Sequence, residues 1–175
     1  RADNGAEVAV KVLRPEILAD FRRDLDAFHL AASLIEFLSP SSRRLRPLDV
    51  VGHFESVVLG ELDMRLEAAS ASEFAENTRG DENFAIPRPH WDLSGRRVLT
   101  SDWAEGIPMA DVAAIRAAGH DTSRIAARLL QLFLSHALRD GFFHADMHQG
   151  NLRVAENGDI IAFDFGIMGE IDEYT

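Results

Sequence analysis

Residues 144–151 read HADMHQGN, and the chain continues through two short apolar stretches to DFG at residues 164–166. The stretches at 152–154 and 159–163 are typical of strands, and the Asn-Gly pair between them favours a tight hairpin turn. Such a hairpin would return the chain beside its own start. We therefore expect Asn151 and Asp164, which flank the hairpin, to lie at the same end and to present oxygen atoms of the kind that Mg²⁺ prefers.

The spacing of the first string, H-x-D-x-x-x-x-N, is that of the catalytic loop of protein kinases, which a D-F-G motif follows. On this interpretation Asp146 accepts or orients the proton of an attacking hydroxyl group or water, and Asn151 holds a Mg²⁺. Asp164 binds the Mg²⁺ that bridges the phosphates of ATP. The two motifs together predict Mg²⁺-dependent transfer or hydrolysis of the γ-phosphoryl group of ATP.

A lysine near the beginning of the chain extends the pattern. Residues 7–13, EVAVKVL, alternate in the manner of a strand, and VAVK matches the kinase strand motif V-A-I-K. We predict that Lys11 contacts the phosphates and that a carboxylate on a helix orients it. The candidates are Glu61, Asp63 and Glu67, whose spacing lets them point in different directions from one helix. A solvated acidic face is the alternative interpretation for each of these acids.

The remaining segments predict an α/β (α+β) fold of the two-lobed protein-kinase type, truncated at both ends. Apolar periodicity predicts helices at about 16–38, 49–77 (with a bend or split at Gly60), 110–118 and 122–141. The apolar stripe at 125–138 is predicted to be core. Strands are predicted near 85–93 and 97–103, with a turn between them and a linker at 106–108. Residues 1–103 would form a partial N-lobe with the ATP lysine, and residues 104–175 a partial C-lobe with the catalytic loop.

Composition excludes several other classes of protein. The chain has a net charge of −11 and no cysteine, so disulfides and cysteine-based zinc sites are excluded. The excess of acid argues against nucleic-acid binding, which needs a basic surface. The dense basic group Arg43, Arg44 and Arg46 is interpreted as a solvated loop. No apolar run is long enough to span a membrane, so membrane association is expected only through parts outside this sequence.

Three alternatives remain open from the residues. The H-x-D-x-H arrangement of His144, Asp146 and His148 could bind a transition metal, but it leaves the DFG string and Lys11 unexplained. A small-molecule phosphotransferase of the aminoglycoside or choline kinase type usually carries D-x-D or D-[W/F]-E in place of DFG. A non-catalytic nucleotide-binding regulator would keep the same residues and use its ATP state to control a partner.

The sequence around these motifs resembles the UbiB/AarF-type atypical kinases, also called the ABC1 or aarF-domain family. Residues 141–152, GFFHADMHQGNL, are close to that family's G-F-F-H-A-D-P-H-P-G-N-L, and residues 61–69, ELDMRLEAA, are similar to its E-x-D-x-x-x-E-A. Residues 8–15 match its lysine strand with the following Arg-Pro, and residues 98–106 look like its hinge strand. The departures are Met147 and Gln149 in place of two prolines, and Ser101 and Asp102 where Met and Glu are usual.

The resemblance implies a role for each matching residue. Lys11 would pair with Glu67, while Asn151 and Asp164 would bind ATP and metal beside the catalytic Asp146. Two hinge residues, Ser101 and Trp103, would line the nucleotide site. Glu61 and Asp63 would form a family-specific pair that faces the substrate side.

The resemblance also implies a wider setting. Family members look like ATP-binding proteins with ATPase-type activity that support the synthesis of ubiquinone or another quinone lipid. A quinone-lipid precursor or quinone-biosynthesis proteins would be partners, at the cytoplasmic side of a bacterial membrane. The family's K-x-G-Q segment and Ala-rich phosphate loop would precede residue 1, so we expect the sequence to be a fragment of a longer protein.

Overall fold

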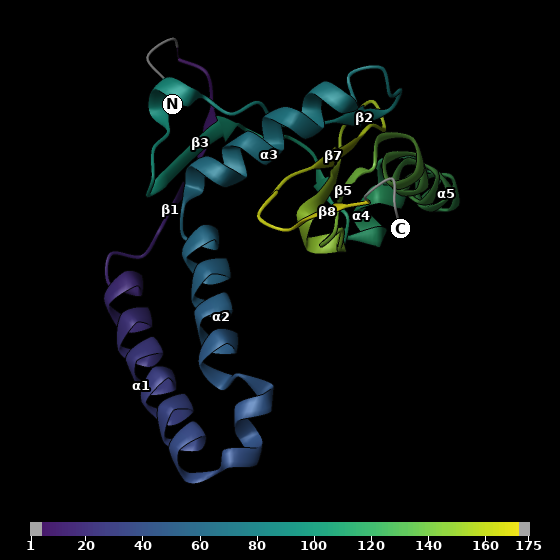
Figure 1. Ribbon diagram of the computed structural model, residues 1–175. Helices are drawn as coiled ribbons and strands as arrows, with labels where there is room; N and C mark the ends of the chain where they lie inside the picture. The colour runs from purple at the N-terminus through teal and green to yellow at the C-terminus, as the bar shows by residue number, and fades with distance from the viewer. Residues whose placement is uncertain (1–4, 172–175) are drawn as a thin grey trace.

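The computed structural model describes residues 5–171, except for the side chains of Pro40 and Glu61, and combines long helices with short strands (Figure 1). The first elements in chain order are β1 Val8–Val12, α1 Ile17–Leu38, the 3-10 helix η1 Pro40–Leu45, α2 Pro47–Glu61 and α3 Met64–Asn77. They are followed by β2 Phe84–Ala85, the 3-10 helix η2 Trp91–Leu93, β3 Val98–Asp102, β4 Ile107–Pro108 and α4 Val112–Ala117. The last elements are α5 Thr122–Ser135, the π-helical turn η3 His136–Asp140, β5 Phe142–His144, the 3-10 helix η4 Gln149–Asn151, β6 Leu152–Val154, β7 Ile160–Ala162 and β8 Met168–Glu170.

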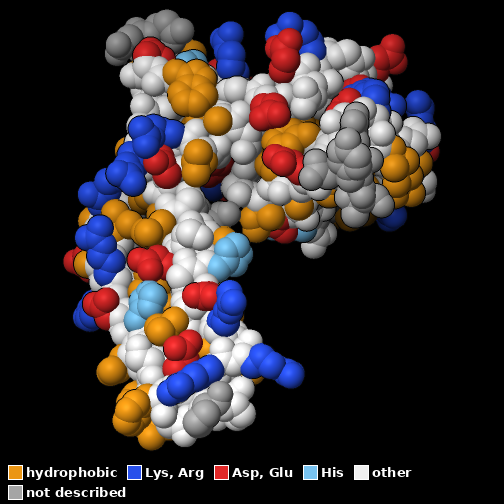
Figure 2. All heavy atoms as spheres, in the orientation of Figure 1, with side chains coloured by type: hydrophobic (Ala, Val, Ile, Leu, Met, Phe, Trp, Pro, Cys, Tyr) orange, Lys and Arg blue, Asp and Glu red, His pale blue; other side chains and the backbone are white. Residues whose placement is uncertain are grey.

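The helices α1 and α2 form an antiparallel hairpin that projects from the rest of the molecule (Figure 1). Phe54 of α2 packs against Phe21 and Phe28 of α1, with ring centroids 6.1 and 6.2 Å apart. Leu25 and Ala32 of α1 are buried, but many large apolar side chains stay on the surface of the hairpin (Figure 2). The hairpin therefore has a narrow core of its own.

The helical region predicted at 49–77, with a bend or split at Gly60, is divided into α2 and α3 close to that residue. The Leu62 N–H donates to the carbonyl of Val58 and ends α2, and Asp63 begins α3 as its N-cap. The Asp63 carboxylate accepts a hydrogen bond from the backbone N–H of Arg65. A capping residue has extended backbone dihedrals that a continuous helix does not allow. The break therefore lies at the capping aspartate, three residues after Gly60, whose carbonyl accepts the Asp63 N–H.

Strands β1 and β3 pair in antiparallel fashion, with Lys11 opposite Leu99. Helix α3 packs on this two-stranded sheet through Met64 and Ala68, which form a buried cluster with Leu99.

The strand predicted at 85–93 is wrong over most of its length. Strand β2 has two residues and pairs in parallel with β7, and residues 91–93 form the helical turn η2. Pro87 and Pro89 interrupt the segment, because proline has no N–H to donate to a sheet ladder.

The C-terminal part is built on a four-stranded sheet in the order β2-β7-β6-β4. A core cluster joins Phe74 of α3 and Leu132 of α5 to Leu152 and Ile160 of this sheet. Because α3 also packs on the β1–β3 sheet, it connects the two sheets. The linker predicted at 106–108 contains β4, which pairs with β6. The boundary predicted at residue 103 follows β3 directly, and the division into two lobes stays a prediction.

Helix α5 continues into η3, and Gly141 ends the helical stretch with a φ of 65°, as a glycine C-terminal cap does. The apolar stripe predicted to be core is buried only in part. Leu132 is buried, whereas Leu130, Leu134 and Leu138 are exposed. Periodicity identifies the apolar face of a helix but not what covers that face. Among residues 5–171, no helix has the length and apolar character needed to cross a bilayer.

The hairpin predicted after Asn151 is present, with Leu152 opposite Ala162 and Val154 opposite Ile160. Its turn is not the two-residue mirror-image type, which needs positive φ at both central residues. Within the turn only Gly158 has a positive φ, of 90°, and its N–H donates to the carbonyl of Ala155.

Candidate active site

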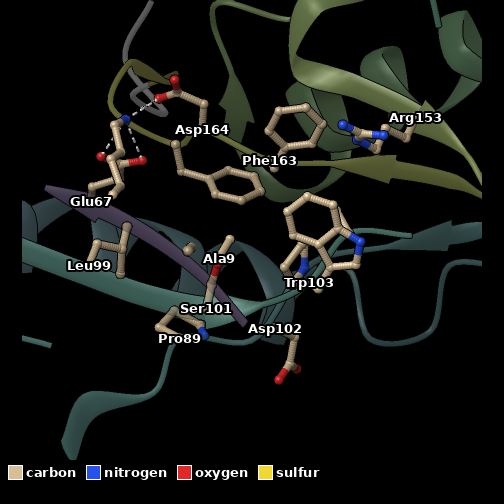
Figure 3. Close-up of a pocket in the computed structure, with 15 residues that line it drawn as sticks. Ala9, Glu67, Pro89, Leu99, Ser101, Asp102, Trp103, Arg153, Phe163 and Asp164 are labelled. Atoms are coloured by element: carbon tan, nitrogen blue, oxygen red, sulfur yellow. Dashed lines mark hydrogen bonds and ion pairs between the residues drawn. The ribbon is translucent and has the colours of Figure 1, made fainter. Parts of the chain in front are cut away.

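A lysine from the first strand meets two carboxylates from distant parts of the chain (Figure 3). The Nζ atom of Lys11 lies 2.9 Å from both carboxylate oxygens of Glu67 on α3 and 2.9 Å from one oxygen of Asp164, which follows β7. These partners are 56 and 153 residues away from Lys11 in the sequence. The tertiary fold thus brings together three of the residues that the sequence predicted for the ATP site.

Local structure explains the position of each partner. The alternation of β1 places Ala9 and Lys11 on the same side, where both line one pocket. Glu67 lies in the first turn of α3, where the helix dipole favours a negative charge. The adjacent Ala68 is fully buried against the β1–β3 sheet, so α3 cannot rotate without exposing apolar surface. The side chain of Glu67 is 7% exposed, whereas those of Lys11 and Asp164 are each 45% exposed.

The electrostatics of the cluster follow from this unequal burial. Burial alone would lower the pKa of Lys11, but its contacts with Asp164 and Glu67 outweigh burial and raise the pKa. Burial also raises the pKa of Glu67, and the contact with Lys11 offsets this only in part. Lys11 is therefore a fixed cation at neutral pH, held beside the half-exposed carboxylate of Asp164.

Asp164 has an uncommon backbone conformation. Its φ is 67°, in the left-handed region that side chains disfavour, although aspartate tolerates this region better than most residues. Such conformations concentrate at functional sites, where the surrounding structure maintains them. Here the residue that adopts it supplies the carboxylate that reaches Lys11.

Asp146 and Asn151 lie on the loop before β6. The Nδ2 group of Asn151 donates to the backbone carbonyl of Asp146 at 3.1 Å and lies 3.5 Å from a carboxylate oxygen of Asp146. Asn151 is buried, while the side chain of Asp146 is 48% exposed. The backbone N–H of Phe163 donates to the carbonyl of Asn151 at 3.0 Å, which ties this loop to the residue before Asp164. The loop thus presents the Asp146 carboxylate to solvent near the strand end that carries Asp164.

The histidines of this loop have structural partners. His144 is fully buried; its Nδ1 accepts a hydrogen bond from the backbone N–H of Asp146, and its Nε2 faces the carbonyl of Phe163 at 3.5 Å. The Nδ1 atom of His148 accepts from the backbone N–H of Gly150. Within the described part of the chain, no three His, Cys, Asp or Glu side chains are grouped as metal ligands. The ring nitrogens of His144 are thus engaged by the loop itself, and the arrangement gives the transition-metal interpretation no support.

A pocket extends from Lys11 along the face of the β1–β3 sheet (Figure 3). Ala9 and Leu99 contribute apolar walls, and the two predicted hinge residues Ser101 and Trp103 both line it. Asp102 points elsewhere, because its carboxylate accepts hydrogen bonds from the backbone N–H of Arg88 and pairs with the ring of His90.

Sequence reasoning missed two further residues of this pocket. Phe163 and Arg153 line it on the side of the hairpin, and the guanidinium carbon of Arg153 lies 5.8 Å from the ring centroids of both Trp103 and Phe163. The signal for Arg153 was its position in β6 between two buried apolar residues, which directs it to the opposite face of the strand. Phe163 precedes Asp164 directly and could have been placed by that adjacency.

Of the predicted substrate-side pair, Glu61 and Asp63, the structure describes only the side chain of Asp63. Asp63 is not part of the Lys11 cluster: its carboxylate accepts from the Arg65 side chain at 2.7 Å and lies 3.5 Å from Arg96. The hydrogen bond from Arg65 lowers the pKa of Asp63 to about 2. The side chain of Glu61 lies outside the described residues. The role of this pair stays a prediction.

The model of the ABC1 atypical kinase-like domain matches residues 1–175, the full length of the chain. The chain belongs to the ABC1 atypical kinase-like family. This ABC1 domain is also similar to the structure of Rv3197 from Mycobacterium tuberculosis in complex with erythromycin, with a TM-score of 0.74 and 28% identity over 96% of this chain. It spans 41% of the length of that protein. These findings confirm the predicted mixed α/β, kinase-like fold.

A second structure, the bifunctional kinase-methyltransferase WbdD, matches with a TM-score of 0.39 and 19% identity, over 63% of this chain and 25% of that chain. The likeness is too weak to support a further conclusion.

Proposed function

We propose that this ABC1 domain binds ATP together with Mg²⁺ and transfers or hydrolyses the γ-phosphoryl group. The observation that carries the proposal is the position of Lys11, held between Glu67 and Asp164 at 2.9 Å on each side at one end of a pocket. A lysine oriented by a helical carboxylate beside an aspartate is the arrangement that kinases use to hold phosphates.

The chemistry of the pocket suits a nucleotide. Ala9, Leu99 and Trp103 provide apolar walls that match the flat faces of a base, while the charged groups gather where Lys11 lies. The guanidinium of Arg153 adds a cation next to Trp103 on the same wall. In a chain of net charge −11, Lys11 is the cation at the charged end of the pocket that can offset a polyphosphate, while Arg153 lies beside Trp103, where a base would pack.

The donor set also suits Mg²⁺. Asn151 precedes β6 and Asp164 follows β7, so both offer hard oxygen atoms at the open end of the hairpin. Mg²⁺ usually takes one or two such ligands from a protein, with waters and phosphates completing its shell. When bound, the ion would neutralise charge on the phosphates. Asp146, half exposed and braced by Asn151, would accept or orient the proton of the attacking hydroxyl group or water.

Within the family we propose the UbiB/AarF type, with a role in ubiquinone or other quinone-lipid synthesis. The support is the GFFHADMHQGNL string and the ELDMRLEAA string, whose last acid, Glu67, pairs with Lys11. On this proposal Glu61 and Asp63 face the substrate, and a quinone-lipid precursor or quinone-biosynthesis proteins are partners at the cytoplasmic side of a bacterial membrane.

The test measures Mg²⁺-dependent phosphate release from ATP by the whole protein and by Asp164→Asn. We expect a loss of about a hundredfold or more, because removing one fixed electrostatic contact to the reacting phosphates typically has that effect on a rate. The exposed Asp92→Asn on η2 makes the same chemical change away from the site and should leave the rate unchanged. Chelation of Mg²⁺ should reduce the wild-type rate to that of Asp164→Asn.

Two outcomes would count against the enzyme. Tight ATP binding with phosphate release no faster than in Asp164→Asn would favour the nucleotide-binding regulator. Equal rates of phosphate release by Asp164→Asn and Asp92→Asn would show that Asp164 has no role in the reaction.

A further inference from the structure

A second pocket lies at the end of the molecule that carries α5, away from β1 and β3 (Figure 1). It has a volume of about 510 Å³, within the range of ligand sites, and it shares no lining residue with the pocket beside Lys11. Helix α5 supplies Arg124, Arg128 and Gln131, the loop before α5 supplies His120, and the turn of the β6–β7 hairpin closes one side.

The two arginines are the notable feature of this pocket. They are four residues apart on α5 and therefore lie on the same face of the helix. Neither forms an ion pair within residues 5–171, although the chain has 29 acidic residues against 18 basic ones. Two guanidinium groups without acidic partners, in so acidic a chain, form a local positive site.

Arg128 carries the second observation. One of its terminal nitrogens donates to the backbone carbonyl of Glu82, which fixes the side chain in the pocket wall. Its Nε atom is buried and has no hydrogen-bond partner in the part of the chain that the structure describes. A ligand in the pocket cannot reach this buried atom, so the donors that Arg128 can offer to an anion are the terminal N–H groups that its bond to Glu82 leaves free.

The residues that line the pocket include two arginines and one acid, Asp121, so the lining keeps a net positive charge. Asp121 also lines the pocket, but its carboxylate accepts hydrogen bonds from the backbone N–H groups of Ser123 and Arg124 as the N-cap of α5. Asp159, next to the hairpin turn, is held by the side-chain amide of Asn157 at 2.7 Å.

We propose that this pocket binds a small phosphate-bearing anion. A guanidinium presents paired N–H groups that match the oxygen atoms of a phosphate, and two of them on one helix face can hold a dianion. Gln131 and His120 add further hydrogen-bonding groups at the same pocket, while Ile125 and Ile160 give it an apolar side for the rest of the ligand.

The test titrates the whole protein with inorganic pyrophosphate by calorimetry at low ionic strength, with a chelator present so that no Mg²⁺ binds at the Lys11 site. We expect a dissociation constant of about 1 mM or below, weakened about tenfold or more by Arg124→Gln and by Arg128→Gln. The binding event that depends on Arg124 should remain in Lys11→Ala, whereas any pyrophosphate held at the Lys11 site would be lost in that variant. Arg22→Gln, the same charge change on the exposed face of α1, should have no effect.

Arg124→Gln is the decisive variant, because Arg128 also contacts Glu82 and its replacement can disturb the fold. Binding that survives Arg124→Gln but disappears in Lys11→Ala would place the anion in the nucleotide pocket and overturn the proposal. Absence of binding up to about 10 mM would also overturn it. Equal affinity for citrate and pyrophosphate would show a general anion effect and contradict the assignment to phosphate.

Discussion

Two clusters of charged side chains in this ABC1 domain use the same chemistry in different surroundings. The first is Lys11 with Glu67 and Asp164. The second joins Asp81, His136 and Arg139: the Asp81 carboxylate lies 2.9 Å from Nε2 of His136 and accepts from Arg139 at 2.7 Å. In both clusters a nearly buried acid contacts a cation from a distant part of the sequence.

The surroundings separate the two clusters. His136 is fully buried, and the rings of Phe74 and Phe84 cover it at centroid distances of 4.9 and 5.1 Å. Lys11 and Asp164 remain half exposed and line a pocket.

In the second cluster only Arg139 reaches solvent, at 49% exposure, while the side chains of His136 and Asp81 are 0% and 10% exposed. We call it the sealed cluster because its buried pair is closed to a ligand, and we call the first the open cluster because it lines a pocket. The sealed cluster should therefore determine stability and the open one nucleotide binding.

The largest effect should come from breaking the sealed cluster with Asp81→Ala. This change leaves His136 buried without its partner and removes one of the two carboxylates that Arg139 contacts, the other being Asp140. We expect the free energy of unfolding to fall by about 2 kcal/mol, the cost of a buried polar group left without its hydrogen bond. Urea unfolding of the whole protein measures this loss. ATP affinity, measured under conditions in which the variant is folded, should equal that of the wild type. A loss of affinity alongside the loss of stability would contradict the separate roles of the two clusters.

Breaking the open cluster with Lys11→Ala should reduce ATP affinity more than stability. We expect ATP affinity to fall about tenfold, because one charged contact to a phosphate is lost. The stability loss should be smaller than for Asp81→Ala, since the lysine is half exposed. Calorimetric titration with ATP and Mg²⁺ measures the affinity, and Arg22→Ala on α1 serves as a charge control. An unchanged affinity would remove Lys11 from the site.

A smaller effect is expected at the start of α3, which carries Glu67 into the open cluster. Asp63→Ala removes the N-cap and should reduce the free energy of unfolding by about 1 kcal/mol at pH 7. Asp63→Asn keeps a capping side chain and should lose less.

The pH dependence of that difference follows from the pKa of Asp63. Because the contacts with Arg65 lower this pKa from 3.8 to about 2, the stability that the carboxylate contributes is complete above pH 4 and disappears as the pH falls towards 2. The gap between the wild type and Asp63→Ala should close over that range. A gap that stays constant would show that the carboxylate charge has no part in it.

The smallest effect should be the pH dependence that His136 gives to the sealed cluster. Burial lowers the pKa of His136 below 6.5, and the contact with Asp81 opposes this shift only in part. The unfolded chain therefore binds a proton first as the pH falls, so the folded state loses stability below pH 6.5. Unfolding at pH 7.5 and pH 5.5 should show a smaller decrease for His136→Gln than for the wild type, and equal decreases would contradict this origin.

The two clusters also differ in how far the sequence could predict them. Lys11, Asp146, Asn151 and Asp164 belong to motifs with fixed spacing, and hairpin geometry alone relates the last two. Nothing in the spacing of Asp81, His136 and Arg139 indicates that they meet, because contacts between distant segments depend on how helices pack.

Local patterns failed where tertiary structure decides the outcome. The apolar stripe of α5 predicted a buried helix, but three of its leucines are exposed. Three acids on one long helix were candidates for pairing with Lys11, and the break at Asp63 gave that residue a capping role instead. The position of Arg153 between Trp103 and Phe163 needs the relative placement of two sheets, which no single segment encodes.

The hydrogen bond from Phe163 to Asn151 has a mechanical consequence. It joins the residues that flank the β6–β7 hairpin, so the hairpin holds Asn151 and Asp164 at a fixed separation. Lys11 and Glu67 stand on a different support, formed by β1 and α3. A rotation of β1 and α3 relative to the β6–β7 hairpin would separate Lys11 from Asp164 without changing the distance between Asn151 and Asp164.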